Sequence, residues 1–225
     1  LEGEGGAGLE YPEADFQVLE SLRDELFPTE DTRLPSDWVD LEGDGVLMPF
    51  STTGERATTF RVRKQFTSKA KPFWVQLKGA PPGKIVDVVM KEGDDLRQDQ
   101  VVLSMLEVFN GLWEEAGVMH NWDGGRELVQ APTYPVATVG TSNGFVGMLE
   151  NSVPCDDIVE IDSRGENGWK ASPTIIPSSV AAFIVIFALN IKDRHKGNMV
   201  VTNDRLANID FGWLEEGPLL DTGLF

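Results

Sequence analysis

The sequence predicts an α+β fold in which a strand-rich part precedes a more helical part. Short segments rich in aromatic and β-branched residues follow one another from about residue 60 to residue 90. A strongly apolar run at residues 180–189 is typical of a buried core helix, because a membrane-spanning helix needs about 20 such residues. The 225 residues, of which 41% are hydrophobic, can form one large domain or two small ones.

The N-terminal part is predicted to be mostly loop. Residues 1–14 are rich in Gly and Glu. Four apolar residues then recur at helical spacing and predict one amphipathic helix that ends before Pro28: Phe16, Leu19, Leu22 and Leu26. Residues 28–58 mix Pro, Gly, Asp and Thr, which predicts loop with at most one short strand. We assign residues 1–59 to an acidic N-terminal segment.

Beyond this segment the pattern predicts strands, a helix and further strands. The strands are expected at residues 60–65, 73–77, 85–90, 134–139 and 145–150. Asp95 or a neighbour is expected to cap a helix that runs to about Ala116. After a polar loop at residues 151–172, Pro177 is expected to begin an apolar helix that ends near Ile191 and is fully buried by its composition.

A last hairpin is predicted around residues 202–205. The order of the elements is a β-rich part, a connecting segment, a buried helix and a hairpin, and it fits the bilobal plan of kinases. The order alone leaves other α+β folds open. We expect a β-rich N-lobe over residues 60–150 and the start of a helical C-lobe, truncated, over residues 151–225.

The charge of the chain is strongly negative and uneven. The net charge is −18, and residues 1–50 hold 14 acidic residues against two basic ones. One stretch is basic, through Arg56, Arg61, Arg63, Lys64, Lys69 and Lys71. No nucleic-acid partner is expected, because such binding needs a broad basic surface. The basic stretch fits a compact anion such as a nucleotide phosphate, although a solvated basic face explains the charge equally well.

The single cysteine and the length of the apolar segments bear on where the protein acts. Cys155 has no second cysteine with which to form an intrachain disulfide, and we expect a small, half-buried thiol. This is compatible with a reducing compartment. No transmembrane segment is expected from the sequence. We therefore expect a cytoplasmic protein that meets membranes only peripherally.

Two short motifs in the C-terminal part carry the groups that phosphoryl transfer needs. Asp193-Arg194-His195 is followed by Asn198, five residues after Asp193, and Asp210 begins Asp-Phe-Gly twelve residues later. The amide oxygen of Asn198 and the carboxylate of Asp210 are hard ligands of the kind that Mg²⁺ prefers. A nearby group must also orient or deprotonate the attacking hydroxyl. Each motif alone is weak, but the two in this order, joined by a hairpin, are specific.

Together these motifs resemble the catalytic and metal-binding loops of the phosphatidylinositol 3-/4-kinase superfamily. Residues 91–99, Lys-Glu-Gly-Asp-Asp-Leu-Arg-Gln-Asp, are similar to its strand-to-helix signature, and residues 66–72, Phe-Thr-Ser-Lys-Ala-Lys-Pro, to its phosphate loop. Residues 134–138 and 147–150 resemble the strands that lead to its adenine-binding hinge. The resemblance covers about residues 60–225 and implies a bilobal protein-kinase-like fold.

The resemblance also implies an ATP site and its residues. Seven residues would contact the nucleotide: Ser68, Lys69, Lys91, Asp99, Tyr134, Glu150 and Ser152. Lys91 would pair with the α- and β-phosphates as a fixed charge, with Asp99 near it. Ser68 and Lys69 could instead belong to a basic hairpin that faces water. Asn151 and Ser152 stand where the family has apolar residues, which weakens the assignment of adenine contacts to side chains at Glu150 and Ser152.

Asp193 and His195 compete for the role of the base, and we expect both to contribute. Asp193 has the spacing of protein kinases, whereas His195 titrates near neutral pH. Arg194 is expected to be structural or to face phosphate, and Asn198 with Asp210 to hold Mg²⁺. Of the other candidates, His120 is expected to be exposed in a loop. Trp74 and Trp113 are expected to belong to the core.

The wording around the catalytic loop favours one branch of the superfamily. Lys192 precedes Asp193, as in type III phosphatidylinositol 4-kinases, whereas 3-kinases and the related large protein kinases usually have Gly there. We expect transfer of the γ-phosphate of MgATP to an inositol hydroxyl of phosphatidylinositol in a membrane surface. A 3-kinase, a related protein kinase and an inactive nucleotide-binding fragment remain alternatives, since the chain stops at Phe225 before the C-lobe is complete. Residues 213–225 contain no Lys or Arg and a net charge of −3, which favours an unphosphorylated headgroup.

Overall fold

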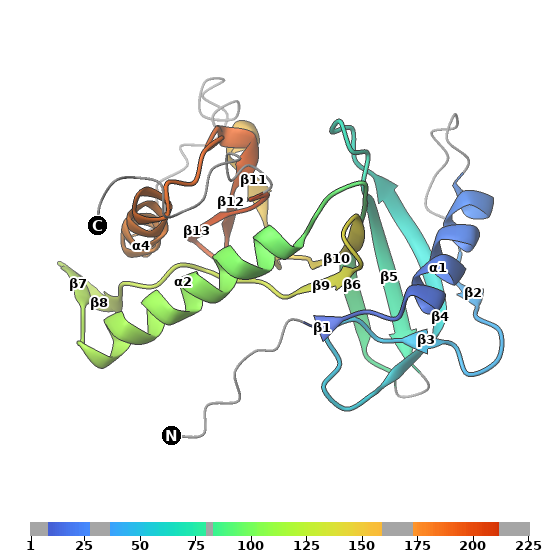
Figure 1. Cartoon of the computed structure of the whole chain (residues 1–225). Coiled ribbons are helices and arrows are strands. Elements are labelled where there is room, and N and C mark those ends of the chain that lie inside the picture. Colours follow the sequence, from blue (N-terminus) through green and yellow to red (C-terminus); the bar gives the residue numbers. More distant parts are fainter. Residues whose placement is uncertain (1–8, 28–36, 80–82, 159–172, 212–225) are drawn as a thin grey trace, which may run out of the picture. The chain divides into compact units, whose positions relative to one another are not determined.

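The computed structural model describes residues 9–27, 37–79, 83–158 and 173–211 (Figure 1). In this part of the chain the structure is α+β, with few helices and a mainly antiparallel sheet. The chain divides into two compact units, which are described separately below. Unit 1 comprises Leu1–Gln100 and Tyr134–Met148, and unit 2 comprises Val101–Thr133 and Leu149–Phe225.

Within the described residues, unit 1 is built on an eight-stranded sheet. Its strands are β1 (Leu9–Glu10), β2 (Val39–Asp40), β3 (Val46–Leu47), β4 (Arg56–Gln65), β5 (Phe73–Gly79), β6 (Ile85–Glu92), β9 (Val136–Val139) and β10 (Asn143–Gly147). Their spatial order is β1-β9-β10-β6-β5-β4-β2, and β3 pairs with β4. The predicted strands are confirmed, with bounds that shift by a few residues.

Helix α1 (Glu13–Leu26) packs against this sheet and confirms the predicted amphipathic helix. Phe16 and Leu19 on its apolar side share one core with alternate residues of the strands, such as Phe60 and Val75. The Phe16 ring meets Phe145 of β10 edge-on, with 5.2 Å between the ring centroids. Acidic residues in the first turn and a basic residue in the last complement the helix dipole. The helix therefore closes one face of the sheet.

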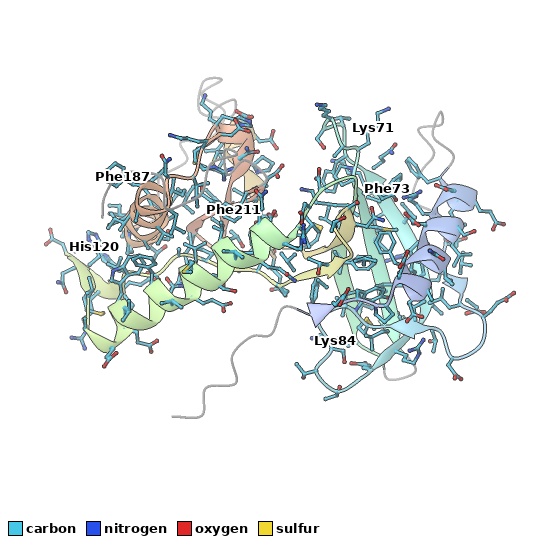
Figure 2. All side chains as sticks on the ribbon, viewed as in Figure 1. Lys71, Phe73, Lys84, His120, Phe187 and Phe211 are labelled. Carbon is cyan, nitrogen blue, oxygen red and sulfur yellow. The ribbon has the colours of Figure 1, made fainter. Side chains whose placement is uncertain are left out.

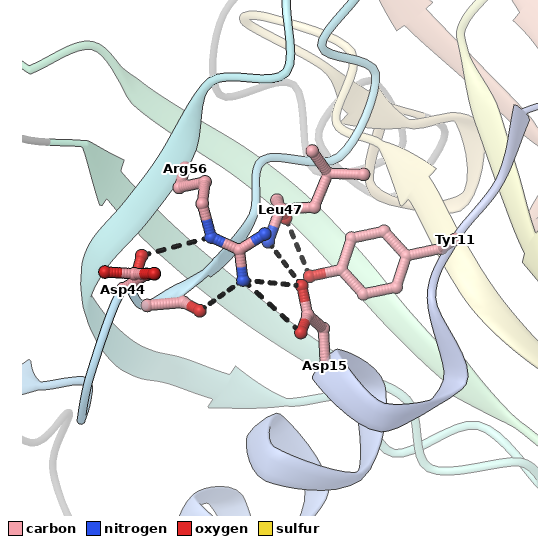
Figure 3. A network of polar contacts seen from close by, with 6 residues as sticks. Tyr11, Asp15, Asp44, Leu47 and Arg56 are labelled. Carbon is pink, nitrogen blue, oxygen red and sulfur yellow. Dashed lines mark hydrogen bonds and ion pairs between the residues drawn. The ribbon is translucent and has the colours of Figure 1, made fainter.

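A polar network fastens the start of α1 to the β3–β4 hairpin (Figure 3). The Tyr11 hydroxyl donates to the Leu47 carbonyl at 2.7 Å, and the Leu47 N–H donates to the Asp15 carboxylate at 2.6 Å. Arg56 binds the same carboxylate at 3.2 Å and the Asp44 carbonyl at 3.1 Å. Burial raises the pKa of the Tyr11 hydroxyl well above its usual value, and the negative charge of Asp15 raises it further. The phenol thus stays neutral and acts as a hydrogen-bond donor.

The prediction of at most one short strand in residues 28–58 was wrong. The described part of this stretch contains β2 and β3, and β4 starts at Arg56. Two-residue strands show no alternation in sequence, so β4 rather than local pattern determines them. Gly45 precedes β3 with φ +71°, and a Cβ there would lie 1.9 Å from the Ala57 carbonyl oxygen, so only glycine lets β3 approach β4 so closely.

Unit 2 contains most of α2 (Arg97–Glu115), which starts in unit 1, together with a second helix and short strands. The elements are β7 (Met119–Trp122), β8 (Gly125–Leu128), β11 (Val153–Pro154), α4 (Ile175–Ala188), the 3₁₀ turn η1 (Lys196–Asn198), β12 (Met199–Thr202) and β13 (Arg205–Asn208). Strands β11, β12 and β13 form one antiparallel sheet. The predicted α2 helix and the predicted last hairpin, β12–β13, are confirmed.

Two expectations in unit 2 were wrong because short strands were missed. His120 was expected in a loop, but it lies in β7, is half-buried, and stacks on Trp122 with 5.7 Å between ring centroids. The turn Asp123-Gly124 that joins β7 to β8 is a typical hairpin signal that was overlooked. The expected polar loop at 151–172 begins with β11, and residues 159–172 lie outside the described part of the chain.

Helix α4 starts earlier than predicted and is not fully buried. It begins at Ile175, so Pro177 sits in its first turn, where proline is tolerated. One side packs inward through Ala181 and Val185, which are fully buried. The other side is apolar and exposed, through Ile176, Val180, Phe183, Ile184 and Phe187, and Phe187 is 87% exposed (Figure 2). The apolar composition predicted a helix that is buried on all sides, but the described residues bury only one side of it.

Candidate functional site

In unit 1, the predicted phosphate-binding lysine lies inside a regular sheet. Lys91 is in β6, opposite Gly144 of β10, and is only 8% exposed. Its ammonium group pairs with the Asp94 carboxylate at 2.9 Å. A Cβ at Gly144 would lie 2.3 Å from the Ala137 carbonyl oxygen, so only glycine fits beside this lysine. A buried ammonium group must be compensated by anions. The sheet and the Asp94 carboxylate therefore hold the Lys91 charge in a fixed position.

The residues that follow Lys91 turn the chain from strand to helix. Gly93 has φ +79°, and Asp95 accepts the backbone N–H of Arg97 at 3.1 Å, which caps α2 as predicted. The Arg97 side chain also binds this carboxylate and lowers the pKa of Asp95 below its usual value. Asp99 follows in the first turn of α2 and is 2% exposed. The motif at residues 91–99 is therefore a capped strand-to-helix connection with two buried charges.

The predicted phosphate loop lies at the same edge of the sheet as Lys91. β5 starts at Phe73, which pairs with Met90, so the loop before β5 and the end of β6 share one edge. Ser68 and Lys69 are exposed in this loop, and the Lys71 N–H donates to the Ser68 carbonyl at 3.0 Å. Figure 2 shows Lys71 at this end of the strands and Lys84 at the opposite end. The structure thus places the predicted phosphate loop and Lys91 at the same edge of the sheet of unit 1.

Other candidates of unit 1 have different surroundings. Tyr134 precedes β9 and is buried, at 6% exposure. Trp74, expected in the core, is half-buried instead, and its indole N–H donates to the Asp87 carboxylate at 2.6 Å. Side chains alternate along a strand, so Asp87 and Lys91 belong to one face of β6. Trp74 pairs with Val89, which lies between them on the same face, so its indole belongs to the face of the sheet that carries Lys91. Trp74 was expected in the core because aromatic residues in a strand suggest one, but its indole N–H reaches a polar partner instead.

In unit 2, the residues after the predicted hinge are held to the β12–β13 hairpin. Glu150 is exposed, and its carbonyl accepts the Thr202 hydroxyl at 2.6 Å. Asn151 donates from its amide to the Asn203 side chain at 3.0 Å. Ser152 is half-buried and leads into β11, which pairs with β12. The Glu150 carbonyl, the Asn151 side chain and the β11–β12 pairing therefore hold this segment to the hairpin.

The catalytic-loop candidates of unit 2 are tied to one another. The Asn198 amide nitrogen donates to the Asp193 carbonyl at 2.8 Å, and the Asp193 carboxylate lies 3.4 Å away. His195 accepts the Gly197 N–H on Nδ1 at 3.0 Å. Its Nε2 lies 3.8 Å from the Asp193 carboxylate. The two candidates for the base are exposed and adjacent.

Arg194 joins this loop to the Asp-Phe-Gly motif. Its guanidinium donates to the Ile209 carbonyl at 2.9 Å and to the Asp210 carbonyl, and it lies 5.2 Å from the centroid of the buried Phe211 ring. The Ile209 N–H in turn donates to the Asn198 carbonyl at 3.0 Å. The β12–β13 hairpin thus returns the chain so that Asn198 and Asp210 lie beside each other. These contacts to backbone carbonyls are compatible with a structural role for Arg194, one of the two that the sequence left open.

The two aspartates of these motifs have an unusual backbone conformation. Asp193 has φ 56° and Asp210 has φ 58°, both in the left-handed region that non-glycine residues seldom adopt. Such residues persist where surrounding contacts determine them, and they gather at functional sites. Both side chains are exposed rather than buried. The hairpin and Arg194 therefore present two carboxylates on a constrained backbone.

The donor set of this cluster suits a magnesium ion. Because the Asn198 nitrogen is committed to Asp193, the amide oxygen is the atom left to meet a cation, and Asp210 supplies a carboxylate. One amide and one carboxylate are typical for Mg²⁺, which keeps several waters and uses phosphate oxygens as further ligands. The described residues contain no group of three or more His, Cys, Asp or Glu placed to hold a metal without such help.

Two features bear on location rather than chemistry. Cys155 is half-buried, as predicted. Burial raises the pKa of its thiol, and the negative charge of Asp156 raises it further. Among the helices that the structure describes, none has the length and apolar character to cross a membrane. Residues 213–225, on which the substrate expectation rests, and Gly212 of the metal loop lie outside the described part.

Comparison with known proteins points to one group of enzymes. No protein-family model matches the chain. The chain is 28% identical over 168 residues to phosphatidylinositol 3-kinase C2 domain-containing subunit gamma of Mus musculus. This match covers 65% of this chain and 11% of that protein. It is 26% identical over 163 residues to a probable phosphatidylinositol 4-kinase STT4 homolog of Encephalitozoon cuniculi, a match that covers 64% of this chain and 11% of that protein. It is also 28% identical over 158 residues to phosphatidylinositol 3-kinase 2 of Dictyostelium discoideum, a match that covers 64% of this chain and 8% of that protein.

The chain therefore spans about a tenth of the length of these relatives. The similarities include 3-kinases and a 4-kinase at nearly the same identity, so they do not separate the two branches. They support a phosphatidylinositol-kinase relationship as a whole, through proteins that are named as kinases of this lipid.

Proposed function

We propose that this chain is part of the catalytic core of a MgATP-dependent phosphatidylinositol kinase, with a bilobal kinase-like arrangement. Unit 1 would be the N-lobe and unit 2 the start of the C-lobe. The observation that carries the proposal is the hairpin of unit 2, which joins the Asp193–Asn198 loop to Asp210 through Arg194 and the Asn198–Ile209 backbone bond. Separate motifs with a chance origin have no reason to be linked by such contacts.

The residues divide the chemistry among themselves. Lys91 would bind the α- and β-phosphates, with Asp99 nearby, while Ser68 and Lys69 offer a hydroxyl, a backbone N–H and an ammonium group to phosphate. Tyr134, Glu150 and Ser152 would flank the adenine, and Glu150 and Ser152 do so chiefly through the backbone.

Asn198 and Asp210 would hold Mg²⁺, which neutralises the charge on the phosphates when bound. Asp193 and His195 would orient the inositol hydroxyl and take up its proton as its oxygen bonds to the γ-phosphorus, while the bond from that phosphorus to the ADP oxygen breaks and ADP leaves. Arg194 holds the two loops in place by binding the carbonyls of Ile209 and Asp210. Each role requires a fixed orientation of a polar group, and the contacts of the cluster provide one.

Within this function we propose phosphatidylinositol as the lipid and the 4-hydroxyl as the acceptor. Lys192 ahead of Asp193 supports the 4-kinase branch, and the acidic residues of 213–225 disfavour a phosphorylated headgroup, because like charges repel. A substrate in a membrane surface would require peripheral contact of the protein with that surface. The comparisons leave a 3-kinase equally open, and the products distinguish the two.

The test is an assay of the full-length protein with MgATP and mixed micelles of phosphatidylinositol, its 4-phosphate or its 4,5-bisphosphate. We expect the highest turnover on phosphatidylinositol and a product with phosphate on the 4-position. A product phosphorylated at the 3-position would replace the 4-kinase by the 3-kinase proposal. Equal or better turnover on the bisphosphate would contradict the substrate argument, and phosphorylation of a Ser/Thr peptide in place of lipid would contradict the lipid-kinase proposal.

A further inference from the structure

The C-terminal end of α1 contacts the sheet at the edge that carries Lys91. Arg23 in the last turn is 7% exposed and forms an ion pair with Glu92, the last residue of β6. Its guanidinium also lies over the Phe73 ring, 4.9 Å from the centroid. Phe27, which follows the helix, meets the same ring edge-on at 5.7 Å. One arginine thus joins α1 to two neighbouring strands.

Both contacts adjoin proposed phosphate-binding residues. Glu92 directly follows Lys91, and Phe73 is the first residue after the loop that contains Ser68 and Lys69. Lys91 and Glu92 are consecutive in one strand, so their side chains leave it on opposite faces. The ion pair with Arg23 holds Glu92 on the α1 face, which directs Lys91 to the other face. The guanidinium thus holds the immediate neighbour of Lys91 on the face opposite to the Lys91 side chain.

The burial of Arg23 makes this link strong. Its side chain is 8% exposed and that of Glu92 36%, so the pair is only partly screened by water. The Arg23 guanidinium also binds the adjacent Asp24 carboxylate, with 2.9 Å between Nε and Oδ1, so Glu92 is one of its two anionic partners. Removing Arg23 takes this buried cation away from Glu92 and from the face of the Phe73 ring. At the opposite end of α1, the Arg56–Asp15 contact also ties the helix to the sheet, but it involves β3 and the start of β4 (Figure 3). The two ends of α1 therefore provide a comparison between a contact beside Lys91 and one remote from it in the same sheet.

We propose that Arg23 is a positioning residue for the nucleotide, acting through Glu92 and Phe73 on Lys91 and the phosphate loop. The proposal rests on the proposed function. It makes α1, which precedes all the motifs that resemble the kinase superfamily, a working part of the ATP site. Loss of the Arg23 contacts lets the end of β6 and the phosphate loop move, so the phosphates meet a less ordered cation.

The test compares Arg23→Met with the matched control Arg56→Met in the full-length protein, because each removes a guanidinium that pairs α1 to the sheet. Thermal unfolding measures the stability of each variant, and a fluorescent ATP analogue with Mg²⁺ measures affinity. Arg23→Met is expected to weaken nucleotide binding about fivefold or more, with Arg56→Met near wild type. In the nucleotide-free protein, hydrogen exchange at residues 88–92 is expected to speed up in Arg23→Met alone.

Two further variants keep the test decisive. Glu92→Gln removes the charge partner without removing bulk and is expected to weaken affinity as Arg23→Met does, whereas Arg23→Lys is expected to recover part of it. Equal affinities of the Arg23→Met, Glu92→Gln and wild-type proteins would overturn the inference, as would an equal loss in Arg56→Met. If Lys91→Met weakens binding in the same assay, such a result leaves the proposed function standing. A wild-type protein that binds no nucleotide would overturn both.

Discussion

Lys91 in unit 1 and the aspartates Asp193 and Asp210 in unit 2 are held in opposite ways. Lys91 is 8% exposed within a regular strand, with ladder partners and an ion pair. The aspartates are exposed, and both lie in loops with φ near +57° (56° and 58°). Unit 1 thus relies on a rigid scaffold, whereas unit 2 relies on a few contacts that constrain two loops.

The difference reflects what each group is proposed to do. A cation that meets every bound nucleotide gains from a fixed direction, and a sheet fixes it without local strain. Carboxylates that meet a metal and an acceptor must be accessible, so loops present them and pay in backbone conformation, about 1–3 kcal/mol for each unusual residue. Substitutions of these charged residues should therefore affect chemistry, and those in the apolar core of unit 1 should affect stability.

The largest effect is expected for Asp210→Asn in the full-length protein. The substitution removes the charged magnesium ligand and should lower the phosphoryl-transfer rate by about 10²-fold or more. The matched control is Asp204→Asn, an exposed aspartate with φ 62° in the turn of the same hairpin. Steady-state rates with lipid substrate measure both variants. More than a tenth of the wild-type rate in Asp210→Asn would contradict the metal assignment.

Lys91→Met is expected to lower turnover by about 10- to 100-fold while the protein stays folded, because a charge-assisted contact to phosphate contributes about 1.5–3 kcal/mol. Lys84→Met is the control, since Lys84 is exposed and lies at the opposite end of the sheet (Figure 2). Circular dichroism follows the fold and an ATP titration follows the kinetics. An unfolded Lys91→Met protein would show that this lysine is structural.

Two phenylalanines test the contrast between buried and exposed surfaces by stability alone. Phe16 is 1% exposed in the core of unit 1, and Phe187 is 87% exposed on α4. Phe16→Ala should lower the free energy of unfolding by about 3–5 kcal/mol, and Phe187→Ala by less than about 0.5 kcal/mol. Urea titrations of the full-length protein measure both. A large loss in Phe187→Ala would show that this face is covered in the protein as it exists.

The smallest effect concerns the cap of α2. The hydrogen bond from Arg97 lowers the pKa of Asp95, so its stabilising contribution is present above the unfolded-state pKa and is lost as the pH falls through the folded-state pKa. Asp95→Asn retains a capping oxygen but does not titrate. The urea midpoint of the wild type should therefore fall slightly more between pH 6 and pH 3 than that of Asp95→Asn. Identical falls would contradict the assignment of the cap.

Much of the fold could be predicted because its elements carry regular patterns. The spacing of Phe16, Leu19, Leu22 and Leu26 predicted α1, and short runs of aromatic and β-branched residues predicted β4 to β6. Strands β2 and β3 have two residues each and carry no period, so their pairing with β4 was not visible. Helix α4 misled because composition reports apolar residues but not which neighbours cover them.

For the candidate site, the sequence predicted that the residues of two motifs lie close together, but not the contacts that hold them. The motif spacing placed Asn198 and Asp210 together, since a hairpin between them returns the chain. The binding of Arg194 to the carbonyls of Ile209 and Asp210 had no sequence signal, because backbone acceptors are present at every residue. The Arg23–Glu92 pair likewise joins residues far apart in sequence, and only the packing of α1 on the sheet reveals it.

The most direct test of the central claim is the dependence of ATP binding on magnesium. Isothermal titration of the full-length protein with ATP, once with Mg²⁺ and once with EDTA, compares wild type and Asp210→Asn. The account predicts that Mg²⁺ tightens ATP binding in the wild type and that this gain is largely lost in Asp210→Asn. A wild-type protein that binds no ATP, or binds it equally well with Mg²⁺ and with EDTA, would contradict the proposal that Asn198 and Asp210 form the metal site of a kinase.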